Sequence, residues 1–459
     1  MAIKRRSFIS GSAVFAAAGI ASPVLGAEKP QAAKPASSDK SGNTAAVAAE
    51  PQPLIASEPM LQNPAETSMG VAWAVSDMAN GFVDYSETPD MSYAKRVKCG
   101  GFRVTGMNNT CQQVRLTGLK PATRYWYRIG ADRISYKGGY AMKRVGTEID
   151  PRIRSFTTPG VAAKSHFCVM NDTHMQWKAF ELVTQKLAEL APPLVVWNGD
   201  ASNTSETFAK ARDVFLTPDV TRKDYAAECP VLFTNGNHDY RGLYNRHLED
   251  IFMFRQPEER DSKYWDLGRN FAVRQGDIAM IGLDTGEDKP DRRDVFAGLF
   301  LCEPYRRLQT QWLAEVLERP DIASAPYIDA FCHIPLFDSN PRSNPGDVCD
   351  NGGGRYDHDF AIWQKSCSEM WGPLFVKHRV QVVIAAHEHK YRYDAPAGTR
   401  TWGQFVGGGP ELGVVRGKAD SRRFPTVIEG KVENGSLKIT VHDVFNRRIA
   451  GEQTFAPRA

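Results

Sequence analysis

The sequence lacks a strong excess of charge of either sign. Its 57 Lys and Arg residues are nearly balanced by 53 Asp and Glu residues, so the formal net charge of the 459-residue chain is +4. Lys4, Arg5 and Arg6 supply three of these charges, and a mature chain without them would carry about +1. A near-neutral chain gives no indication of an extensive basic surface, which argues against a nucleic acid as a stable partner.

The sequence also lacks an apolar run long enough to cross a membrane after processing. The N-terminal segment 1–27 comes nearest, but its Ala- and Gly-rich run up to Leu25 is shorter than the roughly 20 strongly apolar residues that a span needs. A charged start, an apolar middle and small residues at the end predict a cleaved export signal. The paired Arg5 and Arg6 before Phe8 indicate the twin-arginine export machinery, with an ordinary secretory signal as the alternative. We therefore expect a periplasmic or secreted protein.

Large apolar residues are almost missing from residues 28–56 until Leu54 and Ile55. Ala, Pro, Ser and Lys dominate this stretch. Such a composition cannot bury enough surface to offset its chain entropy. The sequence predicts a disordered tether here.

Residues 57–158 lack any long stretch with helical periodicity. Short apolar runs at 69–75, 101–105 and 113–116 are separated by Gly, Asn and Pro turns, which is typical of an all-β sandwich of about 100 residues. The segment 116–128 (LTGLKPATRYWYR) resembles a stretch of fibronectin type III domains in which a turn at Pro leads into a strand whose Tyr caps the sheet corner.

Strand-like and helix-like patterns alternate from residue 165 to about 395. Helical spacing appears at 180–190 and 308–317. Such alternation predicts an α/β domain, in which ligands collect at the carboxyl ends of the strands. Residues 400–458 predict further strands, with a hairpin turn at Asn434-Gly435. Continuous apolar runs that predict buried strands occur at 166–170, 194–197, 231–233, 278–283, 327–332 and 380–384.

Polar clusters follow five of these apolar runs. Carboxylate and amide oxygens together with imidazoles, and no thiolate, suit ions such as Fe, Mn or Zn. Two such ions about 3.5–4 Å apart form the clamp used in phosphoryl hydrolysis. In chain order the clusters are Asp172-Thr-His174, Gly199-Asp200, Gly236-Asn237-His238-Asp239, His333 and His387-Glu388-His389.

In order and spacing the five clusters resemble the signature of the calcineurin-like metallophosphoesterase superfamily: D-x-H, G-D, G-N-H-D/E, a lone H and G-H-x-H. Together with the fibronectin-like region, the arrangement is similar to purple acid phosphatases and their bacterial relatives. The resemblance implies an α/β fold over residues 165–458, a four-layer metallophosphoesterase β-sandwich flanked by helices. An all-β fibronectin type III-like domain at 57–158 would precede it.

The resemblance also implies two metal sites and a second-sphere acid. His238 would be that acid, oriented by Asp239. A metal-activated hydroxide would attack phosphorus, because bound cations lower the pKa of water. Metal one would be held by Asp172, His174, Asp200 and His389, and metal two by Asp200, Asn237, His333 and His387.

Three positions depart from the purple acid phosphatase pattern. Asn203 occupies the position at which those enzymes carry a metal-binding Tyr. The first cluster of this chain contains His174, whereas the first motif of those enzymes usually lacks this histidine. The last cluster begins with Ala386 in place of Gly, which puts in doubt any backbone there that requires a positive φ. The resemblance is therefore to the general superfamily, and a Tyr-ligated ferric ion is not expected.

Four further residues are candidates for substrate contact. Arg355 and His358 lie in a long Pro/Gly/Asn-rich insertion after His333, where they either bind phosphate or belong to a plain surface loop. Arg241 follows the third cluster and has the same two alternatives. Asn203 either touches a phosphate oxygen or serves a turn. Glu388 is expected to point away from the metals, because neighbours on an extended strand face opposite sides.

No two cysteines have the C-x-x-C spacing of a zinc or redox site. The eight cysteines are even in number, and export would permit disulfides. The sequence leaves their connectivity open. The candidate pairs are Cys99 with Cys111 and Cys349 with Cys367, whereas Cys168 and Cys332 stand inside apolar runs as small buried hydrophobes.

The sequence therefore predicts an exported, acid phosphatase-like dinuclear metallophosphoesterase that hydrolyses a small phosphate monoester. A phosphodiesterase acting on a nucleotide or a phospholipid headgroup with the same site is an alternative. A non-catalytic surface binding protein is another, and the complete ligand set argues against it. A D-type alkaline phosphatase shares the export route, but that group uses a Cys-containing metal set and no Cys adjoins the clusters.

Overall fold

A computed structural model describes residues 52–99, 110–256, 261–289, 291, 295–337 and 357–458. The predicted export signal at 1–27 and most of the predicted tether lie outside these residues. The folded unit already includes Gln52. Leu54 is buried, and the backbone N–H groups of Leu54 and Ile55 donate to the carboxylate of Glu148 at 2.7 and 3.1 Å. The tether predicted to reach residue 56 is therefore shorter than expected, because these two apolar residues find partners in the region predicted as the β domain.

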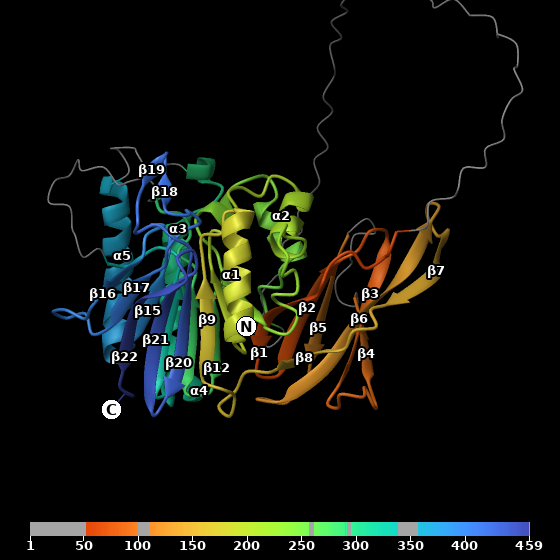
Figure 1. Ribbon diagram of the computed structural model, residues 1–459, viewed down its shortest axis with the longest axis horizontal. Coiled ribbons are helices and arrows are strands. Elements are labelled where there is room, and N and C mark those ends of the chain that lie inside the picture. Colours follow the sequence, from red (N-terminus) through yellow and green to blue (C-terminus); the bar gives the residue numbers. More distant parts are fainter. Residues whose placement is uncertain are drawn as a thin grey trace, which may run out of the picture. The chain divides into compact units, whose positions relative to one another are not determined.

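A nine-stranded sheet runs through most of the molecule (Figure 1). Its three central strands β9, β10 and β11 are parallel, so their carboxyl ends share one edge. In spatial order the sheet comprises β22 (Arg448–Phe455), β21 (Ser436–Asp443), β20 (Thr426–Glu433), β9 (His166–Met170), β10 (Val195–Asn198), β11 (Val231–Thr234), β1 (Met60–Ala65), β2 (Ser68–Ala74) and β5 (Cys111–Thr117).

A second, six-stranded sheet packs against the first. Phe167 and Val196 of the first sheet belong to the same buried cluster as Met280, Phe331 and Ile384 of the second, so the two sheets form a sandwich. Its strands β13, β14, β15 and β17 are parallel. In spatial order the sheet comprises β12 (Phe271–Gln275), β13 (Ile278–Leu283), β14 (Tyr327–Cys332), β15 (Val382–Ala385), β17 (Gly403–Val406) and β16 (Arg392–Asp394).

Helices cover the outer faces of both sheets. Phe180 of α1 (Trp177–Leu190) and Phe215 of α2 (Phe208–Phe215) pack on Trp197 of the first sheet. Leu313 of α3 (Cys302–Glu318) and Trp371 of α5 (Asp357–Lys377) share a core with the second sheet. The short α4 (Pro320–Ala323) follows α3. Helix, sheet, sheet and helix give the four layers that the resemblance implied (Figure 1).

Strands from the predicted β domain form a third sheet, which packs on β1, β2 and β5 through a core around Trp73 and Tyr127. The Tyr125 hydroxyl accepts a hydrogen bond from the backbone N–H of Lys120 at 2.9 Å, so Tyr125 closes the corner as the fibronectin-like stretch predicted. The predicted run 101–105 lies outside the described residues. The strands are β4 (Lys95–Lys98), β3 (Ala79–Ser86), β6 (Arg124–Tyr136), β7 (Met142–Ile149) and β8 (Arg154–Thr157).

The two regions predicted as separate domains share the nine-stranded sheet. Gln62 of β1 is in parallel register with Val231 of β11, and the Tyr127 hydroxyl donates to the carbonyl of Ala227 at 2.5 Å. Residues 52–459 accordingly form one compact unit. None of the described helices is both long enough and apolar enough to cross a membrane.

Candidate metal centre

Each predicted ligand lies just beyond the carboxyl end of a central strand. Asp172 and His174 follow β9, Asp200 follows β10 and Asn237 follows β11. The second sheet supplies the remaining three from the same edge of the sandwich, with His333 after β14 and His387 and His389 after β15. The parallel pairing of these strands brings clusters that are far apart in sequence to one place.

The loops that carry the ligands are unusually constrained. Five ligands have left-handed backbones, with φ of 45° at Asp172, 47° at His174, 50° at Asp200, 69° at His387 and 55° at His389. Such conformations persist only where the surroundings fix them. Here the N–H groups of Asp172 and His174 donate to the carbonyls of Gly199 and Asp200, both at 3.0 Å.

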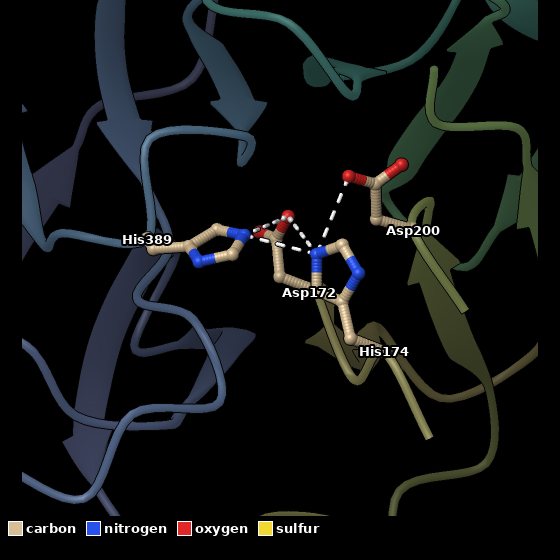
Figure 2. Close-up of side chains that lie close together, drawn as sticks. All are labelled: Asp172, His174, Asp200 and His389. Carbon is tan, nitrogen blue, oxygen red and sulfur yellow. Dashed lines mark hydrogen bonds and ion pairs between the residues drawn. The ribbon is translucent and has the colours of Figure 1, made fainter. Parts of the chain in front are cut away.

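Asp172, His174, Asp200 and His389 form one group that could hold a metal ion. Figure 2 shows His174 and His389 pointing toward each other beside the Asp172 carboxylate, with Asp200 on the far side of His174. The two imidazole Nε2 atoms lie 2.9 Å apart. Oδ1 of Asp172 is 3.4 Å from Nε2 of His389, and Oδ2 of Asp200 is 3.4 Å from Nε2 of His174.

Asp200, His333 and His387 form a second such group, so Asp200 belongs to both. Oδ2 of Asp200 lies 3.2 Å from Nε2 of His333. Asn237 joins this group, because its Oδ1 lies 3.0 Å from Nδ1 of His387. The structure therefore brings together all seven residues that the resemblance assigned to metals, divided into the same two sets.

Hydrogen bonds fix three of the four ligand imidazoles so that Nε2 faces the centre. The Nδ1–H groups of His174, His333 and His389 donate to Oδ1 of Asn203, the carbonyl of Asn198 and Oε1 of Glu411, at 2.9, 2.9 and 2.8 Å. Oxygen partners of this kind commonly orient histidine ligands of metals.

Two atoms of the centre are buried and have no hydrogen-bond partner among the described residues. They are Oδ1 of Asp172 and Nε2 of His333. Leaving a buried polar atom unsatisfied costs about 1–3 kcal/mol, so such atoms usually have a ligand to contact. Oxygen and imidazole donors aimed at common points fit divalent or trivalent cations.

The carboxylates of the centre stabilise positive charge at two of its imidazoles, whereas burial lowers the pKa of His174 and that of His387. Burial opposes ionisation of the two carboxylates, but the imidazoles, chiefly His389 for Asp172 and His333 for Asp200, hold both pKa values below the usual value. Burial also opposes imidazole charging, yet the carboxylates raise the pKa of His333 to about 9 and that of His389 to about 10. Protons or metal cations at these nitrogens would therefore be stabilised.

His238 lies beside the first group, but Asp239 does not orient its ring as predicted. The ring centroids of His238 and His174 are 4.8 Å apart, and the His238 N–H donates to Oδ1 of Asp200 at 2.9 Å. The buried Asp239 carboxylate instead accepts from the backbone N–H groups of Ser202 and Gly236 at 3.2 and 2.9 Å. Both residues begin a single 3-10 turn, where neighbouring side chains point in different directions. Asp239 thus holds the loop that carries His238.

Asn203 and Arg241 contact the histidines of the centre. Besides accepting from His174, Asn203 offers its backbone carbonyl to Nδ1 of His238 at 3.1 Å. Nη1 of Arg241 lies 3.0 Å from Nε2 of His238, and its Nη2 lies 3.3 Å from Oε1 of Glu287. Arg355 lies outside the described residues, and the side chain of His358 is not described. A phosphate contact by either residue stays a prediction.

The Ala386 position raises no backbone conflict. Ala386 is not among the residues with positive φ, whereas His387 is. A methyl group is therefore tolerated where the related motifs have Gly. Glu388 turns toward Arg392, with which it forms a salt bridge.

Three residues at the centre were not predicted from the sequence. Glu411 orients His389, Asn198 orients His333, and Oδ2 of Asp288 lies 3.8 Å from Nε2 of His387. Asn198 directly precedes the Gly199-Asp200 cluster, which is a signal that was available. Glu411 and Asp288 follow strands without any motif, so only the fold reveals them.

The cysteines among the described residues take no part in the centre. The candidate pair Cys99 and Cys111 carries thiols and forms no disulfide, and Cys367 is likewise a buried thiol. Its predicted partner Cys349 lies outside the described residues. Cys168 and Cys332 are fully buried in β9 and β14, as predicted.

Comparison with known families matches most of the described chain. Residues 165–391 match the calcineurin-like phosphoesterase family, and residues 58–141 match the N-terminal domain of purple acid phosphatases. Both spans lie within the regions predicted from the sequence, 57–158 and 165–458. The comparison with curated proteins finds no match.

Solved structures with a similar fold include two that cover most of this chain. The purple acid phosphatase PPD1 from yellow lupin (Lupinus luteus) seeds has a TM-score of 0.58 at 14% identity, covering 87% of this chain and 74% of the lupin chain. PhoD has a TM-score of 0.53 at 12% identity, covering 86% of this chain and 88% of its own. At such identities the likeness shows the fold alone.

Proposed function

Because the chain belongs to the calcineurin-like phosphoesterases and is therefore a hydrolase of phosphoric esters, we propose that it is an exported phosphatase acting on small phosphate monoesters with two metal ions. The observation that carries this proposal is the convergence of two ligand groups on a shared Asp200. A carboxylate common to two groups is the arrangement that two-metal hydrolases use.

Most residues of the centre would bind the ions, and the others would act on the substrate. Asp172, His174, Asp200 and His389 would hold one ion, and Asp200, Asn237, His333 and His387 the other. Fe, Mn and Zn all suit this donor set. When bound, such ions polarise phosphoryl oxygens and acidify water.

His238 would act as the general acid that donates a proton to the ester's leaving group. Its Nδ1–H donates to the Asn203 carbonyl, which leaves Nε2 as the nitrogen that gains or loses a proton. Its backbone N–H is tied to Asp200, so the imidazole stays at a fixed place beside the ions. A proton given to the departing alkoxide from this position lowers the barrier to ester cleavage.

The central test replaces Asp200 by Asn, which keeps the size of the side chain but removes the shared charge. We expect kcat/KM for nitrophenyl phosphate to fall at least about 100-fold and the metal content, measured by mass spectrometry, to fall from two ions per chain. The exposed Asp266→Asn is the matched control. Unchanged hydrolysis in D200N would reject the enzyme mechanism and favour a binding protein.

Substrate preference and export need separate tests. Bis-nitrophenyl phosphate measures diesterase activity under the same conditions, and a higher kcat/KM for it would replace the monoester proposal by a diesterase. The export proposal is supported by Arg5, Arg6 and the apolar run that follows them. Continued export of a fusion in a host without the twin-arginine machinery would reject that route.

A further inference from the structure

Arg241 lies at the edge of the metal centre, within reach of His238. Its Nη1 is 3.0 Å from Nε2 of His238, whose own backbone N–H donates to Asp200. Its side chain is 29% exposed. Only His238 thus lies between the guanidinium and the shared carboxylate of Asp200, and the guanidinium remains accessible to a ligand.

A buried carboxylate holds the guanidinium in this place. Nη2 of Arg241 contacts both oxygens of Glu287, at 3.3 and 3.5 Å, and the Glu287 side chain is only 3% exposed. Lys289 donates to the same Glu287 at 3.0 Å. Burying a carboxylate is unfavourable unless it is paired, so this pair fixes the position of the arginine.

The guanidinium retains donors for a ligand. A guanidinium has five N–H donors in a planar fork. The N–H donors of Arg241 contact only His238 and Glu287 among the described residues, and its Nε–H has no partner there. A fork of this kind matches the oxygens of phosphate in pairs.

We infer that the guanidinium of Arg241, held beside Nε2 of His238, forms an anion subsite that binds the non-bridging oxygens of a phosphate monoester, with Glu287 as the positioning residue. The subsite rests on the proposed function, and it adds the residue that selects a monoester over a diester. A monoester carries up to two negative charges and a diester only one, so a fixed guanidinium favours the monoester.

The test compares three variants on two substrates. For Arg241→Ala we expect kcat/KM for nitrophenyl phosphate to fall about 100-fold and that for bis-nitrophenyl phosphate to fall by less than about 10-fold. Arg241→Lys should recover part of the loss, because it restores the charge without the fork. Glu287→Gln should raise KM for the monoester with a smaller change in kcat, because the guanidinium loses its anchor.

Arg222→Ala is the matched control, since it removes an arginine paired with a carboxylate, that of Asp224, away from the centre. It should change neither substrate's kcat/KM. Thermal unfolding of each variant identifies any loss of folding, and R241K keeps the comparison valid if R241A is unstable. Equal losses on the two substrates in R241A and R241K would overturn the inference.

Binding of inorganic phosphate gives a readout that does not depend on turnover. Calorimetry on the metal-loaded protein should show a Kd about 10-fold weaker in R241A than in R222A or the unaltered chain. Unchanged phosphate binding in R241A would overturn the subsite even if hydrolysis fell. Arginine-dependent phosphate binding by a chain that hydrolyses neither ester would support the subsite and reject the proposed function.

Discussion

Asn203 shows how one side chain takes a role that its position in the sequence did not indicate. The resemblance drew attention to this position because related enzymes place a tyrosine there. In this chain the amide accepts from Nδ1 of His174, and the backbone carbonyl lies near Nδ1 of His238. Asn203 therefore orients two histidines at once, without being a predicted ligand.

We predict that Asn203→Ala weakens metal binding and lowers kcat/KM by about 10- to 100-fold, the usual effect of losing a partner that orients a metal ligand. The measurement is the metal retained after dialysis together with the hydrolysis rate. Asn80→Ala, at a half-buried position in β3, is the control. Full metal retention in N203A would show that His174 needs no such support.

Asp329 carries a stability cost unrelated to the metal centre. It lies in β14, fully buried, and neither carboxyl oxygen has a hydrogen-bond partner among the described residues. Burial raises the pKa of Asp329 well above its usual value. The folded chain therefore keeps this carboxyl protonated at a pH where the unfolded chain ionises it.

This difference sets the sign of a pH dependence. The contribution of Asp329 is most favourable below the unfolded pKa of about 3.9 and is lost as the pH rises, with a slope of up to about 1.4 kcal/mol per pH unit. Asp329→Asn cannot ionise, so its stability relative to the unaltered chain should increase between pH 5 and pH 8. Urea unfolding at both pH values measures this, and parallel profiles would contradict it.

At the scale of single elements, the hairpin of β20 and β21 was predicted correctly from the sequence. Glu433 pairs with Ser436, and the two turn residues Asn434 and Gly435 have φ of 51° and 71°. Two successive positive φ values match the type I′ turn that Asn-Gly favours. Local chemistry suffices here because the turn is specified by its own two residues.

Gly435→Ala should lower the free energy of unfolding by about 1 kcal/mol, because a side chain is strained at this positive φ. No atom lies within 4 Å of a Cβ placed there, so the effect isolates the backbone. Gly146→Ala in β7 is the matched control, since that site is equally open and lacks a positive φ. Equal effects of the two substitutions would refute the backbone argument.

Buried strands were easier to predict from the sequence than helices. The predicted strands at 166–170, 278–283 and 327–332 coincide with β9, β13 and β14, because buried parallel strands are continuous apolar runs. Helices α2 and α5 were not predicted. Helix α5 begins within the Pro- and Gly-rich insertion and carries Pro373, so its composition hid the helix.

At the scale of the whole molecule, the two predicted regions depend on each other. Strands β1, β2 and β5 extend the sheet that carries Asp172 and Asp200, and the side-chain amide of Gln62 donates to the Ile251 carbonyl at 3.0 Å and its carbonyl accepts from the Met253 N–H at 3.0 Å. Without them, β11 would become an exposed edge strand.

A chain that starts at residue 159 should therefore aggregate, whereas one that starts at residue 52 should stay soluble. Size-exclusion chromatography after equal expression measures the difference. The reason is the loss of β1, β2 and β5 from the nine-stranded sheet, which leaves β11 as an exposed edge. A soluble, metal-binding chain from residue 159 would show that the shared sheet is dispensable.

The sequence by itself determined the ligand chemistry, because Asp, Asn and His clusters at the ends of apolar runs are local patterns. Asp172, Asp200 and His333 were predicted as ligands before the fold was known. Only the tertiary structure showed that Glu411 supports His389, that Glu287 places Arg241 and that Asp239 binds backbone N–H groups instead of the His238 ring. These are contacts between segments from separate strands, and their geometry arises only when the two sheets pack with their carboxyl edges together.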